Sequence, residues 1–130
     1  MKFLGIDYGS KHIGIAVSDE EGKIAFPRTT LSNDSDVFKA VDALITHEKI
    51  GIVVIGDTRA SGGVENPITT EADAFADRIA KDQRVQVERV WELWSSIEAS
   101  RYAPTGKEHD NAAAAAIILQ RFLDSRAARL

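Results

Sequence analysis

The stretch from Lys2 to Asp19 constrains the fold more than any other segment, because it predicts two strands joined by a tight turn. Lys2–Tyr8 is an almost unbroken apolar run, which is typical of a strand that is covered on both faces. Gly9 and Ser10 have the chemistry of a turn. His12–Ser18 then alternates large apolar residues with small ones, and this period of two indicates a returning strand.

Asp7 interrupts the first apolar run near its end, beside the turn that carries Lys11 and His12. A carboxylate in apolar surroundings costs free energy unless something pairs with it, and a metal ion is one such partner. The alternative interpretation is that Asp7 caps the turn through hydrogen bonds to its own backbone. This stretch alone leaves the two interpretations open.

The length and composition indicate a globular protein of one domain, residues 1–130, with room for a hydrophobic core. The chain has no cysteine, which excludes disulfides and thiolate zinc sites. No apolar run has the length of a membrane span and the chain begins with a strand, so we expect a cytoplasmic location and no membrane partner. The net charge of −4 argues against binding nucleic acid through bulk charge, but it allows a local basic patch or an acidic site neutralised by divalent metal.

Further strands and helices alternate along the rest of the chain. Ile24–Leu31 predicts a third strand, and Pro27 within it favours the edge of a sheet. Ser32–Asp34 offers N-caps for a helix of about four turns that ends near Lys49. Its predicted buried face consists of Val37, Val41, Leu44 and Ile45.

The second half of the chain continues this alternation. Gly51–Gly56 is a short β-branched strand, and Asp57–Ile68 is a polar, glycine-rich loop. Pro67 suits the first position of a helix, and Arg84–Trp91 predicts a fifth strand. The last helix is expected from near Asp110 to about Ser125. Helices that join strands one, four and five imply parallel neighbours, so we expect an α/β fold. Its five-stranded mixed sheet would have strands one to three as an antiparallel meander and helices on both faces.

Three acids follow the ends of the predicted parallel strands, where ligands gather in open α/β sheets: Asp7, Asp57 and Glu92. Asp110 opens the last helix and could face the same edge. Converging carboxylates repel one another unless cations intervene, and hard oxygen ligands suit Mg²⁺ or Mn²⁺. Two such ions about 4 Å apart can activate a water and stabilise the leaving oxygen in phosphodiester cleavage. The alternative is that these acids are turn and cap residues.

Basic groups near the same edge could hold the phosphates of a substrate. The candidates are Lys11, His12, Arg59 and Lys107. Gly62 and Gly63 would let backbone amides approach a nucleic-acid strand. The alternative interpretation of each basic residue is a solvated surface charge.

The sequence Gly5–Asp19, GIDYGSKHIGIAVSD, resembles the opening of the YqgF family. These RuvC-like, RNase H-fold proteins are described as pre-16S rRNA nucleases or as Holliday-junction-resolvase-like proteins. The resemblance extends over essentially the whole chain. It includes VVIG at Val53–Gly56, WELWSSIEA at Trp91–Ala99 and AAAAIILQRFLD at Ala113–Asp124.

The resemblance implies a nuclease that uses Mg²⁺ or Mn²⁺, with Asp7 as the central ligand. Glu92 matches the glutamate of the family's D-E-R segment, and Asp110 stands where the third acid precedes the closing helix. Asp57 is a further candidate ligand. The implied substrate is RNA, namely the 5′ end of pre-16S rRNA, or branched DNA of the Holliday-junction type.

The chain departs from the family pattern in several places, one of which is the G-x-P segment after the fourth strand, which reads Gly56-Asp57-Thr58 here. Trp91 and Leu93 replace the acid and the arginine that flank the glutamate, and a gapless match puts Asn111 rather than Asp110 at the third acidic position. Asp57 would add an acid near Asp7 and partly compensate for the altered third position.

These departures keep other hypotheses open. One is a catalytically weakened nucleic-acid-binding module of the same fold. Another is half of an actin-like ATP-binding fold, which the length argues against, because two such lobes are needed to enclose a nucleotide. A homodimer through the predicted short helix Ser95–Tyr102 is also open.

Overall fold

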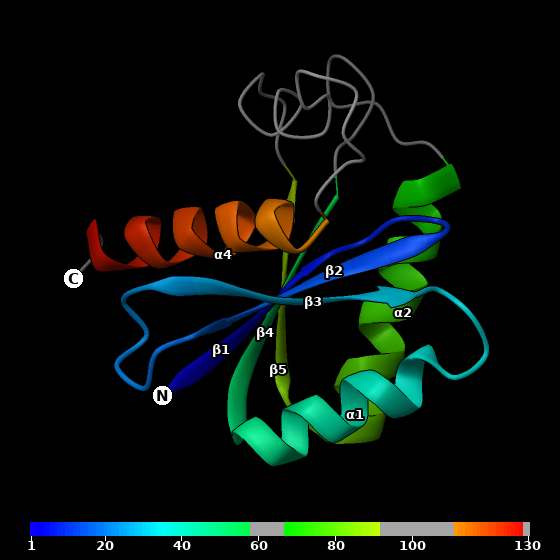
Figure 1. The fold of residues 1–130 in the computed structure, drawn as a ribbon, viewed down its shortest axis with the longest axis horizontal. Coiled ribbons are helices and arrows are strands. Elements are labelled where there is room, and N and C mark those ends of the chain that lie inside the picture. The colour runs from blue at the N-terminus through cyan, green and yellow to red at the C-terminus, as the bar shows by residue number, and fades with distance from the viewer. Residues whose placement is uncertain (58–66, 92–110, 129–130) are drawn as a thin grey trace.

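The computed structural model describes residues 1–57, 67–91 and 111–128 of the chain. In these residues strands and helices alternate in the predicted order (Figure 1). The elements are β1 (Lys2–Asp7), β2 (His12–Ser18), β3 (Ala25–Ser32), α1 (Val37–Glu48), β4 (Ile50–Asp57), α2 (Pro67–Gln83), β5 (Gln86–Trp91) and α4 (Asn111–Ala128). The predicted short helix Ser95–Tyr102 lies outside the described residues.

The sheet has the strand order β3-β2-β1-β4-β5. β1 pairs antiparallel with β2, and β2 pairs antiparallel with β3. β4 runs parallel to both β1 and β5. The predicted meander and the predicted parallel neighbours are therefore confirmed.

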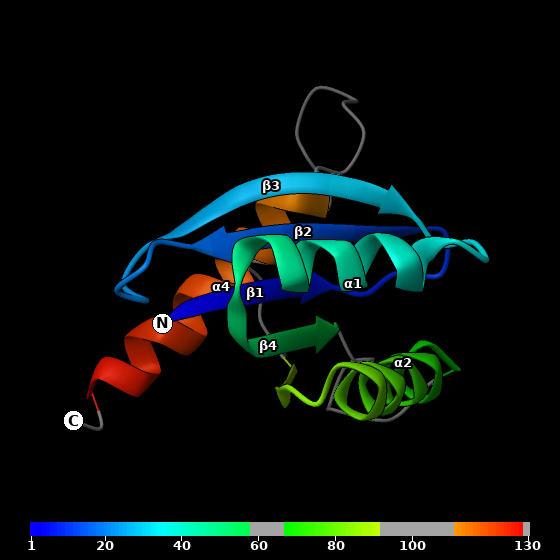
Figure 2. The same ribbon diagram turned by 90° about the horizontal axis from the view of Figure 1, so that it is seen from below.

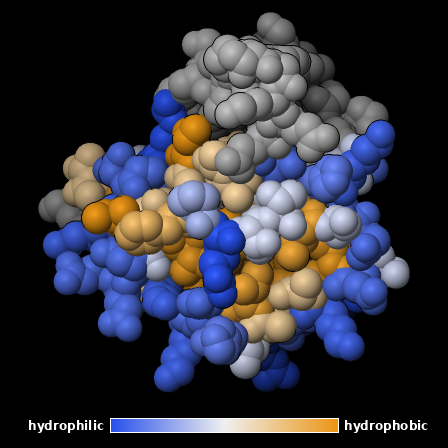
Figure 3. Space-filling view, in the orientation of Figure 1, coloured by the Kyte–Doolittle hydropathy of each residue, from blue (hydrophilic) through white to orange (hydrophobic). Residues whose placement is uncertain are grey.

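The strand β3 forms one edge of the sheet, as Pro27 predicted. Its register with β2 shifts by one residue, because Ile15 pairs with Thr29 while Ala16 pairs with Pro27, which leaves Arg28 as a bulge. A proline and a bulge both hinder the pairing of an edge with another strand. The exposed fractions of Ile24 and Phe26 beside this edge are 52% and 53%. Figure 3 shows separate apolar patches on the face turned to the viewer, with hydrophilic side chains between and beside them.

Helices cover both faces of the sheet, with α1 and α2 on one face and α4 on the other (Figure 2). Large and small residues alternate along β2, and this alternation explains how the core under α1 and α2 differs from the core under α4. The large residues Ile13, Ile15 and Val17 belong to the core under α1 and α2, whereas Ala16 belongs to the core under α4. The predicted face of α1 is buried or partly buried in the first core, with Val37, Val41, Leu44 and Ile45. The α2 residues in the same core are Ala72, Phe75, Ala76 and Ile79.

The helix α4 lies very close to the backbone of the sheet. A Cβ atom added at Gly5 would lie 2.7 Å from Cβ of Leu119, and one added at Gly14 would lie 1.8 Å from the backbone oxygen of Asn111. Only glycine fits under such a contact. The small side chains of Ala112–Ala116 extend this close approach along the helix.

The helix α1 begins later than the sequence predicted, so the prediction that Ser32–Asp34 caps it was wrong. Ser32 still belongs to β3, and the N-cap is Asp36, which makes no capping hydrogen bond with its side chain. Instead, Oδ1 of Asp34 accepts a hydrogen bond from the backbone N–H of Asp36 at 3.0 Å. The helix ends as expected at Lys49, whose left-handed backbone (φ 56°) lets its N–H reach the carbonyls of the last turn.

Two further boundaries differ from the prediction by more than one residue. β5 begins at Gln86 rather than Arg84, because Arg84 has φ 52° and cannot continue an extended strand. α4 continues to Ala128 rather than ending near Ser125. Within the described residues, none of the helices combines the length and the apolar character that crossing a membrane requires.

The turn between β2 and β3 should make stability depend on pH. Oδ1 of Asp19 accepts backbone hydrogen bonds from Lys23 (2.7 Å) and Ile24 (3.1 Å), and these bonds hold the pKa of Asp19 below its ordinary value of 3.8. A carboxylate with a lowered folded-state pKa stabilises the fold fully above its unfolded-state pKa, and this contribution is lost as the pH falls through the folded-state value. Asp19→Asn should therefore lower the melting temperature at pH 7.

Circular dichroism melts of wild type and Asp19→Asn between pH 7 and pH 3 would check this. The difference between the two proteins should shrink as the pH falls below about 4. Glu21→Gln is the control, because the carboxylate of Glu21 is 70% exposed and pairs with the similarly exposed Lys23. The melting temperature of Glu21→Gln should stay close to that of wild type at every pH. A difference for Asp19→Asn that stays constant with pH would contradict the prediction.

Candidate active site

Asp7 is the last residue of β1, and its exposed fraction is 2%. Among the described residues, Asp7 and Ser18 are the buried polar or charged side chains. Ser18 is engaged with backbone, since its Oγ accepts from the N–H of Phe3 and donates to the carbonyl of Asp19, both at 2.8 Å. Asp7 is thus a carboxylate held inside the protein at the carboxyl end of a central strand.

The side chain of Asp7 lies on the face that α4 covers. Asp7 alternates with Gly5, which contacts Leu119 of α4, and it is the register partner of Gly14. Gly14 in turn lies directly beneath the backbone of Asn111, the first residue of α4. The structure therefore brings the end of β1 and the amino end of α4 together. That end of a helix carries a partial positive charge, which favours a nearby anion.

The carboxyl ends of the parallel strands β1, β4 and β5 lie on the same side of the sheet (Figure 1). β4 ends at Asp57, one position beyond the register partner of Asp7, and β5 ends at Trp91, the register partner of Asp57. Neighbouring strands are about 4.8 Å apart, so the ends of β1 and β5 are separated by roughly 10 Å. Glu92 follows Trp91 directly in the sequence.

Most of the predicted metal ligands lie outside the described part of the chain. Glu92 and Asp110 are not described, and neither is the side chain of Asp57. Within the described residues, no group of three histidine or acidic side chains converges as a metal site. Of the predicted ligands, the structure describes the side chain of Asp7, and a buried carboxylate of this kind fits Mg²⁺ or Mn²⁺ better than softer metals.

The turn between β1 and β2 lies beside Asp7 and presents the two basic candidates Lys11 and His12. Both are exposed, whereas the neighbouring Asp7 and Tyr8 are buried. The position of Lys11 and His12 allows contact with a ligand that approaches this edge from solvent. Arg59 and Lys107, the other predicted phosphate contacts, lie outside the described residues, as do Gly62 and Gly63.

Residues 1–125 match the model of a protein family described as RuvX: Holliday junction resolvase. This chain belongs to the RuvX family. The match confirms the resemblance to YqgF proteins that the sequence motifs indicated.

Two curated relatives of this RuvX chain carry the name "Putative pre-16S rRNA nuclease". The relative from Oleidesulfovibrio alaskensis is 39% identical over 101 residues, which cover 76% of this chain and 70% of the relative. The relative from Bordetella petrii is 36% identical over 124 residues, which cover 94% of each chain. Similarity to proteins of this name therefore extends over nearly the full length.

Solved structures of resolvases have the same fold as the RuvX chain. RuvC of T. thermophilus, in complex with a Holliday junction substrate, superposes with a TM-score of 0.63 at 15% identity, covering 98% of this chain and 96% of RuvC. Fowlpox virus resolvase, in complex with Holliday junction DNA, gives a TM-score of 0.60 at 12% identity, covering 97% and 99%. These likenesses confirm the predicted RuvC-like, RNase H-like α/β fold.

The sequence did not identify Asn33, which the structure places against the turn beside the candidate active site. The side-chain amide of Asn33 donates to the hydroxyl of Tyr8 at 3.1 Å and to the carbonyl of Gly9 at 2.9 Å. Its backbone N–H donates to the carbonyl of Lys11, also at 2.9 Å. In the sequence, an asparagine between a strand and a helix indicates a helix cap, and no local signal separates that role from this one.

Arg89 is a second residue that sequence analysis missed. From β5 it donates to the carbonyl of Ile55 in β4 at 2.8 Å and pairs with Asp73 of α2 at 2.9 Å. It therefore joins two strands and a helix near the edge where β4 and β5 end. The side chain of Arg89 is 23% exposed.

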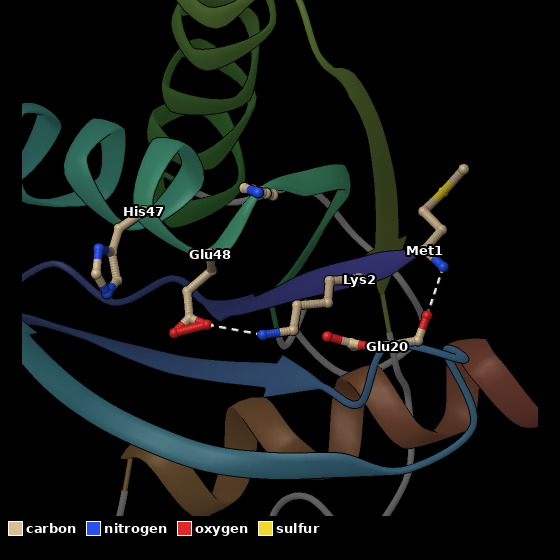
Figure 4. A pocket seen from close by; sticks show the side chains of 6 residues that line it. Met1, Lys2, Glu20, His47 and Glu48 are labelled. Carbon is tan, nitrogen blue, oxygen red and sulfur yellow. Dashed lines mark hydrogen bonds and ion pairs between the residues drawn. The ribbon is translucent and has the colours of Figure 1, made fainter.

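A pocket of about 500 Å³ lies at the amino end of β1, at the far end of that strand from Asp7 (Figure 4). Nζ of Lys2 and Oε2 of Glu48 form an ion pair of 3.0 Å in its wall. Its lining consists of Met1, Lys2, Glu20, His47, Glu48 and Lys49. Because Asp7 is at the other end of β1, this pocket is separate from the candidate active site.

Proposed function

We propose that this chain is a divalent-metal-dependent nuclease that hydrolyses phosphodiester bonds in the cytoplasm. The observation that carries the proposal is the position of Asp7. It is a buried carboxylate at the carboxyl end of β1, next to the amino end of α4 and at the edge where β4 and β5 end. Membership of the RuvX family supports it.

In this proposal Asp7, Glu92 and Asp110 hold Mg²⁺ or Mn²⁺, and Asp57 is a further ligand candidate. When bound, such ions activate a water and stabilise the leaving oxygen. Asp7 would supply a fixed ligand, because its strand is hydrogen-bonded on both sides. Lys11, His12, Arg59 and Lys107 would hold substrate phosphates through charge and hydrogen bonds.

The proposed substrate is RNA, at the 5′ end of pre-16S rRNA. The names of the relatives that align over most of this chain support this choice. Branched DNA is the second candidate, because the family description names Holliday junctions. A weakened binding module is the third, and it is favoured by the neutral Asn111 at the start of α4, where the family pattern has an acid.

A cleavage assay with two substrates tests the proposal. Purified protein is incubated with an RNA that spans the 5′ end of 16S rRNA and with a four-way DNA junction, in Mg²⁺, Mn²⁺, Ca²⁺ or EDTA. We expect cleavage of the RNA with Mg²⁺ or Mn²⁺ and none with EDTA. A mock purification from cells without the expression plasmid controls for contaminating nucleases.

The other outcomes separate the candidates. Cleavage of the junction alone would replace RNA by branched DNA as the substrate. Binding of either nucleic acid without cleavage in any metal would overturn the nuclease and leave the binding module. Cleavage that persists in EDTA would contradict metal dependence.

A further inference from the structure

We infer that Asn33 is a positioning residue for the nucleic-acid contacts of Lys11 and His12. The inference rests on the proposed function, because it assigns Asn33 a role in that same site. The observation behind it is that one residue, placed directly after β3, contacts three of the four residues that connect β1 to β2.

These contacts use every donor that Asn33 has. A side-chain amide carries two N–H donors, and the bonds to Tyr8 and to Gly9 match that number. The backbone N–H makes the third bond, to the carbonyl of Lys11. Asn33 therefore contacts the turn at Tyr8, Gly9 and Lys11. The turn is tightest at Gly9, where an added Cβ atom would lie 2.5 Å from the carbonyl oxygen of His12.

The contact with Tyr8 connects the turn to a rigid part of the protein. Tyr8 is 7% exposed, and its ring packs against Phe75 of α2 with 5.2 Å between ring centroids. Phe75 packs in turn against Phe38 of α1 at 4.8 Å. The backbone N–H of Tyr8 also donates to the carbonyl of Gly56 in β4 at 3.0 Å. Asn33 therefore holds the turn against the core under α1 and α2.

Asn33 acts on the opposite side of the sheet from Asp7. Tyr8 belongs to the core under α1 and α2, whereas the neighbouring Asp7 faces α4. A change at Asn33 should therefore disturb the turn and leave the Asp7 side chain in place. Lys11 and His12 are exposed, and a fixed backbone reduces the conformational entropy that they lose when they bind a phosphate.

The experiment is a double-mutant cycle between Asn33→Ala and Lys11→Ala, read out as nucleic-acid affinity in Ca²⁺, where chemistry does not interfere. Asn33→Ala should weaken binding about ten-fold, within the range of coupling seen for contacting residues. On the Lys11→Ala background it should weaken binding much less, because the residue that it positions is absent. A Mn²⁺ titration should give the same metal affinity for Asn33→Ala as for wild type.

Ser35→Ala is the matched control, because Ser35 is an exposed residue of the same loop. Tyr8→Phe is a second test that preserves the ring and removes only the hydroxyl, and it should weaken binding by less than Asn33→Ala. Amide hydrogen exchange at residues 9–12 should be faster in Asn33→Ala than in Ser35→Ala. This last measurement needs no substrate.

The outcomes distinguish this inference from the proposed function. If wild type binds nucleic acid and Asn33→Ala binds as tightly, the positioning role is overturned and the proposed function stands. Additive effects of Asn33→Ala and Lys11→Ala would likewise overturn it, because Asn33 would then not act through Lys11. If wild type binds no nucleic acid, both fail, and faster exchange at residues 9–12 would then mark a purely structural role.

Discussion

Replacing Asp7 with asparagine is expected to abolish metal-dependent cleavage while the protein stays folded. The substitution preserves the shape of the side chain and removes the charge that would hold the metal. We expect a loss of roughly 10³-fold or more, as for other residues that act directly on the reacting groups. Cleavage rates in Mn²⁺ and the metal affinity from calorimetry would both be measured, and both should fall together.

Asp19→Asn is the matched control for Asp7→Asn. It makes the same chemical change in the turn between β2 and β3, at the opposite edge of the sheet, so it should retain cleavage and metal binding at pH 7. Circular dichroism would show whether each variant is folded. Cleavage by Asp7→Asn within about ten-fold of wild type would rule out Asp7 as the central ligand, because that is less than a lost metal ligand costs.

Replacing Gly14 with alanine should have the second largest effect, on both stability and activity. The added Cβ would lie 1.8 Å from the backbone oxygen of Asn111 and 3.0 Å from the backbone N of Ala112. Both atoms belong to backbone, so α4 has to move at its amino end. Overpacking of this kind typically costs about 1–3 kcal/mol. Because Gly14 is the register partner of Asp7, the shift occurs at the candidate active site.

Gly51→Ala provides the control for Gly14→Ala. Gly51 is also a strand glycine, but the nearest atoms to its added Cβ are in the flexible side chain of Met1, at 2.8 and 3.0 Å. The same methyl group should therefore cost little there. Thermal melts and cleavage rates of both variants would be compared. Equal melting temperatures of Gly14→Ala and Gly51→Ala would contradict the prediction, because they would show that α4 can move away from β2 at little cost.

Most of the architecture could be predicted because it follows from periodic patterns. Alternation in His12–Ser18 and the apolar stripe of α1 fix which side chains are buried, and the handedness of crossovers then fixes the parallel pairs. The boundaries were harder to predict where a single residue leaves the pattern. Arg84 shortens β5 through its left-handed backbone, which nothing in its residue type indicates.

The candidate site could be predicted only where the signal lies within one strand of the sequence. Asp7 was identifiable because an acid in an apolar run is unusual. Asn33 was not, since its partners Tyr8 and Gly9 precede it by 25 and 24 residues and a capping role fits the local sequence equally well. The contact of Gly14 with α4 joins segments even further apart. For Glu92, Asp110, Arg59 and Lys107 the sequence remains the basis of the prediction.

The close approach of α4 to the backbone of the sheet has an electrostatic consequence. Where a helix rests on glycine without intervening side chains, no water fits between the helix and the strand at Gly14. Charges at the end of β1 are then separated from the first peptide groups of α4 by a weakly polarisable gap, in which Coulomb interactions are screened far less than in solvent. A developing negative charge at that position would be stabilised by the helix end, even at ionic strengths that suppress attraction at the exposed Lys11.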